Sequence, residues 1–136
     1  MNNLLKSIKI NEGFKPRVYK DTLGIDTIGY GFAIKDLHLD EDLSEEILKR
    51  KVNKLIKRIY KTFDWFINMP EDVQEVVVEM CYQMGVSGFS KFKKTIKLLS
   101  EKQFTDASTE MLDSLWAKQT PNRALKLSNI VGKAKG

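Results

Sequence analysis

Cysteine and histidine are nearly absent from this chain of 136 residues, which holds only Cys81 and His38. A single cysteine excludes a disulfide within the chain, and one cysteine with one histidine cannot supply the ligands of a Cys/His zinc site. We therefore predict no structural metal. Cys81 lies among apolar residues at helical spacing, and a nucleophilic thiol would need a nearby base, so a small buried core residue is the favoured interpretation.

Long apolar runs are also missing, and no segment approaches the length needed to cross a bilayer. The apolar part of the N-terminal segment MNNLLKSIKINEGF is too short and too interrupted for a secretory signal, so we expect no export by a signal of its own. With 136 residues, of which 42% are hydrophobic, the chain suits one soluble domain with a single core that a cleft can divide into two lobes.

Positive charge exceeds negative charge, with 23 Lys and Arg against 18 Asp and Glu, a formal net charge of +5 and a pI near 9.2. This balance favours a polyanionic partner, whether a nucleic acid, an acidic membrane surface or an anionic cell-wall polymer, and charge alone does not choose among them. The basic residues along one predicted helix are expected to form its solvated face. They are Lys49, Arg50, Lys51, Lys54, Lys57 and Arg58.

The first third of the chain predicts a helix followed by a β-hairpin. Apolar residues at helical spacing indicate a helix over about 3–11, and Gly13 is a suitable stop, so Glu12 falls at the C-terminal end of this helix. Two β-prone runs, 17–20 and 25–30, flank the turn-forming residues 21–24. This pattern is typical of two antiparallel strands joined by a short loop.

The remainder of the chain predicts helices only, because its apolar residues keep a helical spacing. We expect helices from residue 42 or 44 to Phe63, from Pro70 to a break at Gly85 and Gly88, from Phe89 to Leu99, from Phe104 to Leu115, and from an N-cap at Thr120 with Pro121 onward. The predicted fold is therefore mainly α-helical, of the α+β class, with a small N-terminal β-hairpin.

Three residues of the segment from Glu12 to Gly31 form a candidate catalytic group. Glycoside hydrolysis needs a proton donor for the leaving oxygen and commonly a second carboxylate that activates water or attacks the anomeric carbon. Glu12, near the negative end of a helix dipole, suits the proton donor, Asp21 suits the ionised carboxylate, and the Thr27 hydroxyl suits a water-holding group. Each also has an ordinary interpretation, namely a solvated helix end, an Asx-turn former and a strand threonine.

Three blocks of the sequence together carry a resemblance to a known family. The first is E-G-(x)5-Y-x-D-T-x-G-x-x-T-I-G-Y-G over 12–31, the second is Tyr82-Gln83-Met84-Gly85 with Gly88-Phe89, and the third is W-A-K-Q-T-P-N-R over 116–123. These blocks follow in order over most of the chain, which as a whole resembles the T-even phage lysozymes of glycoside hydrolase family 24. No single block is decisive, but the three together are highly specific.

The resemblance implies a lysozyme-like fold, with one domain over 1–136 built from two lobes that flank a cleft. The small N-terminal lobe would carry the β-hairpin and extend over about 12–57. The larger helical lobe would combine 1–11 with 58–136.

The implied activity is that of a muramidase, which hydrolyses the β-1,4 bond between N-acetylmuramic acid and N-acetylglucosamine in bacterial peptidoglycan. By the resemblance, Glu12 would be the general acid, and Asp21 with Thr27 would place or activate water, with inversion at the anomeric carbon. Inversion would require the two carboxyl groups to lie about 6.5–9.5 Å apart, leaving room for the water.

The resemblance also implies four substrate-binding residues in the helical lobe. Arg123 would approach Glu12, Gln83 and Trp116 would lie at the base of the cleft, and Tyr82 would line a sugar subsite. Core packing is the ordinary interpretation of Trp116, and both roles can hold for one tryptophan.

The expected partner is bacterial peptidoglycan, bound by a monomer without a cofactor, without nucleic acid and without stable membrane insertion. The resemblance implies a protein of the phage-infected host cytoplasm that reaches the cell wall or periplasm only after a membrane lesion, for which a holin would be the functional partner. Three alternatives stay open. They are a weak or inactive wall-binding relative, a basic nucleic-acid-binding helical protein, and a membrane-active protein with basic amphipathic helices.

Overall fold

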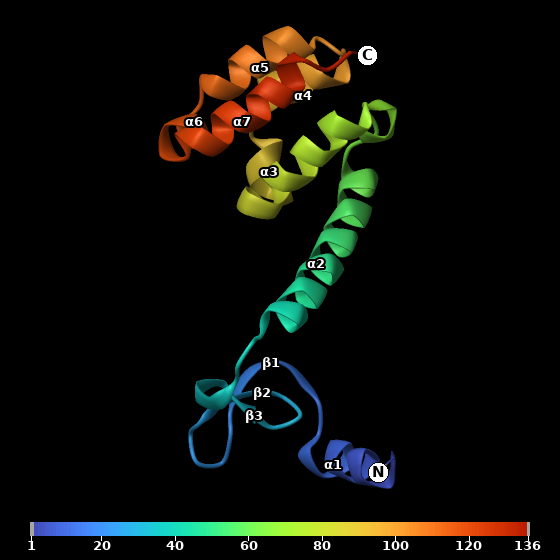
Figure 1. Ribbon diagram of the computed structural model, residues 1–136, viewed down its shortest axis with the longest axis vertical. Coiled ribbons are helices and arrows are strands. Elements are labelled where there is room, and N and C mark those ends of the chain that lie inside the picture. The colour runs from blue at the N-terminus through green and yellow to red at the C-terminus, as the bar shows by residue number, and fades with distance from the viewer. Residues whose placement is uncertain (1, 136) are drawn as a thin grey trace. The chain divides into compact units, whose positions relative to one another are not determined.

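The computed structural model describes residues 2–135 and is mostly helical, with one small antiparallel sheet, as the sequence predicts (Figure 1). Its regular elements are α1 (Asn2–Glu12), β1 (Lys15–Lys20), β2 (Asp26–Gly29), β3 (Phe32–Ala33), η1 (Ile34–Asp36), α2 (Glu41–Thr62), η2 (Phe66–Asn68), α3 (Glu71–Ser90), α4 (Lys93–Ser100), α5 (Phe104–Leu112), α6 (Leu115–Gln119) and α7 (Pro121–Gly132). The chain forms two compact units, Met1–Glu45 and Glu46–Gly136. The lobe boundaries implied by the family resemblance stay a prediction.

The first unit carries the predicted helix and hairpin. Helix α1 ends at Glu12 because Gly13 takes a left-handed φ of 72° and its N–H donates to the carbonyl of Lys9 at 2.9 Å. The three strands lie in the order β1-β2-β3, and Tyr19 pairs with Thr27 across the first two. A bulge in β1 shifts the register before this pair. The sequence predicted the first two strands and offered a third within residues 31–43, where β3 follows a tight loop over 29–31.

The side chains of the first unit are mostly exposed. Among residues 3–45, only Thr27 is buried, with 4% of its surface exposed. Apolar side chains of α1, including Leu5 and Ile8, are exposed, although they have the spacing of an amphipathic helix. The structure of this unit is therefore set by turns, glycines and strand hydrogen bonds more than by a hydrophobic core of its own.

Helix α2 begins where the sequence predicts and has a polar N-terminus. The Asp40 carboxylate accepts the backbone N–H of Leu43 at 2.7 Å, and Glu41 and Asp42 occupy the first turn, where acidic residues favour the helix dipole. All six basic residues from Lys49 to Arg58 singled out in the sequence are exposed. The prediction of a solvated basic face is confirmed.

The second unit contains the hydrophobic core. Helix α7 packs against α3, α5 and α6, and α4 packs against α5. The largest fully buried side chains of this core include Phe66, Phe89, Ile59, Met80, Leu99, Met111, Val73, Val77 and Val131. These residues hold the elements that carry Tyr82, Gln83, Trp116 and Arg123.

Four local predictions in this unit need correction. The predicted helix over 104–115 ends at Leu112, and a separate helix, α6, begins at Leu115. Gly85 does interrupt α3, with φ 79° and ψ 161°, but Gly88 lies within a helical turn. The predicted helix over 89–99 is divided at Lys91 and Phe92, and α4 begins only at Lys93. Thr120 occupies the N-cap position of α7, yet its hydroxyl donates backwards to the carbonyl of Trp116 at 3.0 Å and caps no helical N–H.

Cys81 is a buried core residue, as the sequence predicts, with 1% of its surface exposed. Burial raises the pKa of its thiol to about 12, with a smaller opposing effect of the Arg58 charge. We expect the native protein to resist thiol reagents such as Ellman's reagent at pH 8 and to react after unfolding.

The raised pKa of Cys81 also makes folding stability depend on pH. Because the folded pKa lies above the unfolded one, this thiol's contribution to stability is complete below pH about 9 and declines as the pH rises toward 12. In denaturant titrations at pH 7–11, the free energy of unfolding should decline less with rising pH in Cys81→Ala than in the wild type.

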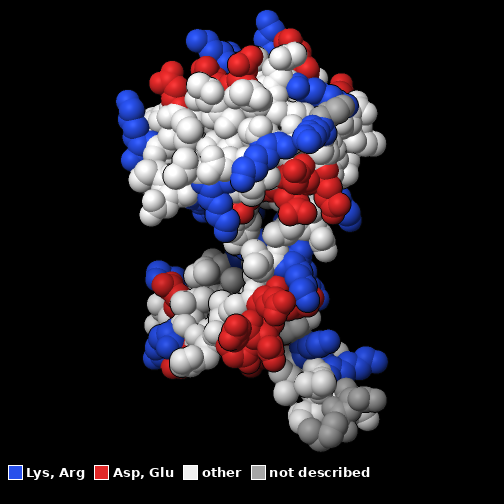
Figure 2. Space-filling model, turned by 45° about the horizontal axis from the view of Figure 1, so that its top comes forward, with Lys and Arg blue, Asp and Glu red and all other residues white. Residues whose placement is uncertain are grey.

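Charges of both signs are mixed on the surface. On the face in Figure 2, Lys and Arg side chains form separate groups with Asp and Glu between them. This face offers no single continuous basic surface of the kind that nucleic-acid-binding proteins use. Among residues 2–135, no helix is both long and apolar enough to span a membrane.

Candidate active site

Glu12 is the last residue of α1, and its carboxylate lies against the loop between β2 and β3. A Cβ atom added at Gly31 would collide with Oε2 of Glu12 and would lie only 3.0 Å from Cδ. No residue among 2–135 donates a hydrogen bond to this carboxylate or forms an ion pair with it. The structure thus places the carboxyl group beside the glycine loop and leaves its oxygens open to a ligand.

Asp21 begins the turn between β1 and β2, and the two oxygens of its carboxylate differ. Oδ1 accepts the backbone N–H of Leu23 at 2.8 Å and of Ile25 at 2.9 Å. The Asx-turn interpretation of Asp21 is therefore confirmed. Oδ2 has no protein partner within the described part of the chain, so one oxygen holds the turn and the other remains an open acceptor.

Thr27 lies on β2, and its hydroxyl proton is already used. Oγ1 donates to the carbonyl of Ile25 at 2.9 Å. The same Ile25 donates its N–H to Asp21, so one residue orients both side chains. With its proton engaged, the Thr27 oxygen can only accept further hydrogen bonds. A water molecule that reached this oxygen would donate a hydrogen bond to it.

The second unit brings Gln83 and Trp116 together. Nε1 of Trp116 on α6 donates to Oε1 of Gln83 on α3 at 2.9 Å. The ring of Phe92 meets the indole edge to face, with centroids 6.0 Å apart. Trp116 is 7% exposed, so its ordinary interpretation as a core residue is confirmed, and its orientation is fixed by both contacts.

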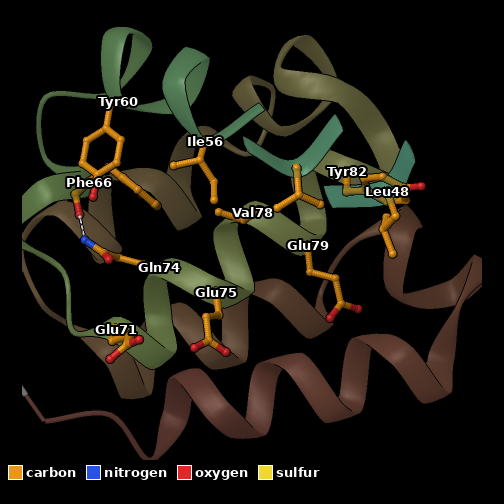
Figure 3. A pocket seen from close by; sticks show the side chains of 11 residues that line it. Leu48, Ile56, Tyr60, Phe66, Glu71, Gln74, Glu75, Val78, Glu79 and Tyr82 are labelled. Atoms are coloured by element: carbon orange, nitrogen blue, oxygen red, sulfur yellow. Dashed lines mark hydrogen bonds between the residues drawn. The ribbon is translucent and has the colours of Figure 1, made fainter. Parts of the chain in front are cut away.

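Tyr82 lines a hollow of about 490 Å³ between α2 and α3. In Figure 3, Tyr82 and Leu48 lie at one end of the hollow and Tyr60 with Phe66 at the other. Its walls are mostly apolar, and Glu71, Glu75 and Glu79 follow one another along α3 (Figure 3). Tyr82 is 47% exposed, which leaves its ring accessible to a ligand.

Arg123, in the first turn of α7, forms an ion pair with Glu79 of α3. Its Nε donates to Oε2 of Glu79 at 2.8 Å. The sequence did not single out Glu79, but it lies four residues before Gln83 on the same helix face, and this spacing is a signal that could have found it. The predicted approach of Arg123 to Glu12 stays a prediction.

The sequence model of one family, described as phage lysozyme, matches residues 9–130. The chain belongs to the phage lysozyme family. The match includes Glu12, Asp21 and Thr27 as well as the four candidate binding residues of the second unit.

Relatives of this phage lysozyme family member occur in very different sources. It is 26% identical to a probable T4-type lysozyme 1 of Dictyostelium discoideum, over 96% of this chain and 94% of that protein. It is 27% identical to a probable T4-type lysozyme 2 of the same organism, with the same coverage. It is also 24% identical to the pre-baseplate central spike protein Gp5 of Enterobacteria phage T4, of which the matched part is 27%. Family membership supports a lysozyme-type glycoside hydrolase that acts on peptidoglycan.

Gly31 gives a test of how the Glu12 carboxylate is placed. Gly31→Ala would add a methyl group where the carboxylate lies and would strain a left-handed residue of φ 77°, a conformation that costs roughly 1–2 kcal/mol for a non-glycine residue. We expect the rate of hydrolysis to fall at least about tenfold, since misplacing a catalytic group strongly lowers the rate. The assay is the release of reducing ends from purified peptidoglycan.

The matched control for this substitution is Gly24→Ala. Gly24 has φ 79°, and nothing lies within 4 Å of a Cβ atom built there. Because Gly24 lies in the turn that holds Asp21, this variant should lose comparable stability and should lower activity through Asp21 instead of Glu12. In the Glu12→Gln background, Gly24→Ala should therefore lower the residual activity further and Gly31→Ala should not. Equal further losses for the two substitutions in that background would contradict a specific effect of Gly31 on Glu12.

Proposed function

We propose that this phage lysozyme family member is an N-acetylmuramidase of glycoside hydrolase family 24. It hydrolyses the β-1,4 bond between N-acetylmuramic acid and N-acetylglucosamine in peptidoglycan, with inversion. The observation that carries the proposal is that Oδ1 of Asp21 holds the turn while Oδ2 remains open, and that the same Ile25 orients Thr27, whose hydroxyl can only accept. This pair suits the placement of a nucleophilic water.

In the proposed reaction, two protons are transferred, the glycosidic C1–O bond breaks, and a new bond forms between C1 and the oxygen of water. Glu12 donates its proton to the glycosidic oxygen as the C1–O bond breaks. Water, held by Asp21 and Thr27, attacks C1 from the opposite face and gives its proton to the Asp21 carboxylate. The products are a free 4-hydroxyl group on one sugar and a hydrated reducing end on the other. Solvent then returns the proton to Glu12 and removes one from Asp21.

Tyr82, Gln83, Trp116 and Arg123 are proposed to bind the glycan. The exposed Tyr82 ring offers an apolar face to a sugar ring, and the Trp116–Gln83 hydrogen bond holds both side chains in fixed orientations. The guanidinium of Arg123 supplies donors for polar groups of the substrate. The net charge of +5 would favour accumulation on an anionic wall, with an effect that weakens as salt rises.

We propose host lysis of the phage type as the biological setting. The protein would act as a monomer, remain in the host cytoplasm until a holin opens the membrane, and then reach the wall. The match to the phage lysozyme family model supports this setting.

The test is digestion of purified peptidoglycan, with mass spectrometry of the released fragments. Hydrated reducing N-acetylmuramic acid ends are expected. Anhydro ends would indicate a lytic transglycosylase, reducing N-acetylglucosamine ends would indicate the other glycosidic bond, and binding without release would indicate a wall-binding relative. Proton NMR of the first products, recorded before mutarotation, should show the α-anomer if the reaction inverts.

A further inference from the structure

Two long-range polar contacts start from a single turn of α3. Gln83 accepts from Trp116 of α6, and one turn earlier Glu79 accepts from Arg123 of α7. The partners of the first contact are separated by 33 positions in the sequence, and those of the second by 44 positions. Tyr82 lies on the same turn and lines the same hollow as Glu79 (Figure 3). Side chains of this part of α3 thus orient Trp116 and Arg123, and the same helix carries Tyr82.

The position of Arg123 explains why it needs a carboxylate partner. It is the third residue of α7, close to the helix N-terminus, where the dipole disfavours a positive charge. Glu79 supplies the compensating negative charge and accepts the Nε–H at 2.8 Å. This contact fixes the plane of the guanidinium and leaves its Nη groups without another partner within residues 2–135.

The ion pair between Arg123 and Glu79 can orient the guanidinium, but it contributes little to folding stability. The side chains of Arg123 and Glu79 are 37% and 46% exposed, and exposed ion pairs contribute little to folding. A guanidinium presents a planar fork of donors, so its orientation decides which groups it can bind.

We propose that Glu79 is a positioning residue of the glycan-binding site, which holds the Nη edge of Arg123 toward the substrate. This inference rests on the proposed function, because it needs Arg123 to contact glycan. Glu79 itself touches no reacting group and acts through Arg123.

The test is a double-mutant cycle with peptidoglycan hydrolysis as its activity readout. Glu79→Ala and Arg123→Ala should each lower kcat/KM about tenfold, mainly through KM, and the double variant should be no worse than Arg123→Ala, as expected for residues in contact. Glu79→Gln should keep most of the activity, because its side-chain oxygen still accepts the Nε–H. The matched control is Glu46→Ala on α2, which removes an exposed ion pair of the same kind, Nε of Arg50 to Oε1 of Glu46 at 3.0 Å, and should behave as the wild type.

Two further measurements do not need turnover. The ¹⁵Nε resonance of Arg123 should lose its protection from hydrogen exchange in Glu79→Ala and keep it in Glu46→Ala. Binding of a tetrasaccharide of alternating N-acetylglucosamine and N-acetylmuramic acid, measured in the Glu12→Gln background, should weaken about tenfold in Glu79→Ala, again without further loss in the double variant. Thermal unfolding should show all variants folded at the assay temperature.

These readouts separate the two hypotheses. If the wild type hydrolyses peptidoglycan while Glu79→Ala matches it, or the single losses add in the double variant, the positioning role is wrong and the proposed function stands. If the wild type does not hydrolyse, the proposed function is wrong, and coupled losses in tetrasaccharide binding would still support the positioning role. The positioning role would be wrong if Glu79→Ala left tetrasaccharide binding, or the exchange protection of the Arg123 resonance, unchanged.

Discussion

We expect Glu12→Gln to lower kcat for peptidoglycan hydrolysis by about 10²–10⁴-fold, the usual contribution of general acid catalysis. Glutamine has nearly the same shape as glutamate, so the contact with Gly31 remains, but its amide cannot deliver a proton to the leaving oxygen. Because the Glu12 side chain is exposed and has no ion-pair or hydrogen-bond partner among residues 2–135, the fold should be unaffected. The measurement is the initial rate of reducing-end release at matched folded concentration.

The control for Glu12→Gln is Glu101→Gln. Glu101 is also an exposed glutamate at the C-terminal end of a helix, in this case the C-cap residue of α4. Its substitution should leave hydrolysis unchanged. Equal rates for the wild type and Glu12→Gln would move catalysis away from Glu12.

Asp21→Asn is expected to have an effect of similar size, with a loss of about 10²-fold or more in kcat. The asparagine oxygen can still accept the N–H groups of Leu23 and Ile25, so the turn should persist. What disappears is the negative charge and the ability to take a proton from water. Turnover and thermal unfolding should be measured on the same preparations, because the prediction is a large change in rate with a small change in stability.

A second substitution at the same position separates the two roles of the carboxylate. Asp21→Ala removes the catalytic oxygen and also leaves two turn N–H groups without their acceptor, which should cost about 1–3 kcal/mol of folding stability. Asp21→Asn and Asp21→Ala should therefore be similarly slow but differ in stability. Near-wild-type turnover in Asp21→Asn would contradict water activation by Asp21.

The sequence by itself determined the local structure around the candidate catalytic residues. Gly13 ends α1 directly after Glu12, and the turn beginning at Asp21 forms between the two predicted strands. Left-handed glycines, Asx turns and alternating strands act over a few residues, so their effects can be inferred from the residues alone. For the same reason the helices could be predicted in outline from the residues, with errors at interruptions and boundaries such as Gly88 and Lys91.

Only the tertiary structure decided which side chains meet across longer distances. The Glu12 carboxylate lies over Gly31, Trp116 is held by Gln83, and Arg123 is paired with Glu79. None of these contacts is dictated by local propensity, because each depends on how separate elements pack and on which rotamers that packing allows. The residue types of the candidate site can therefore be recognised in the sequence, while their long-range partners depend on how the separate elements pack.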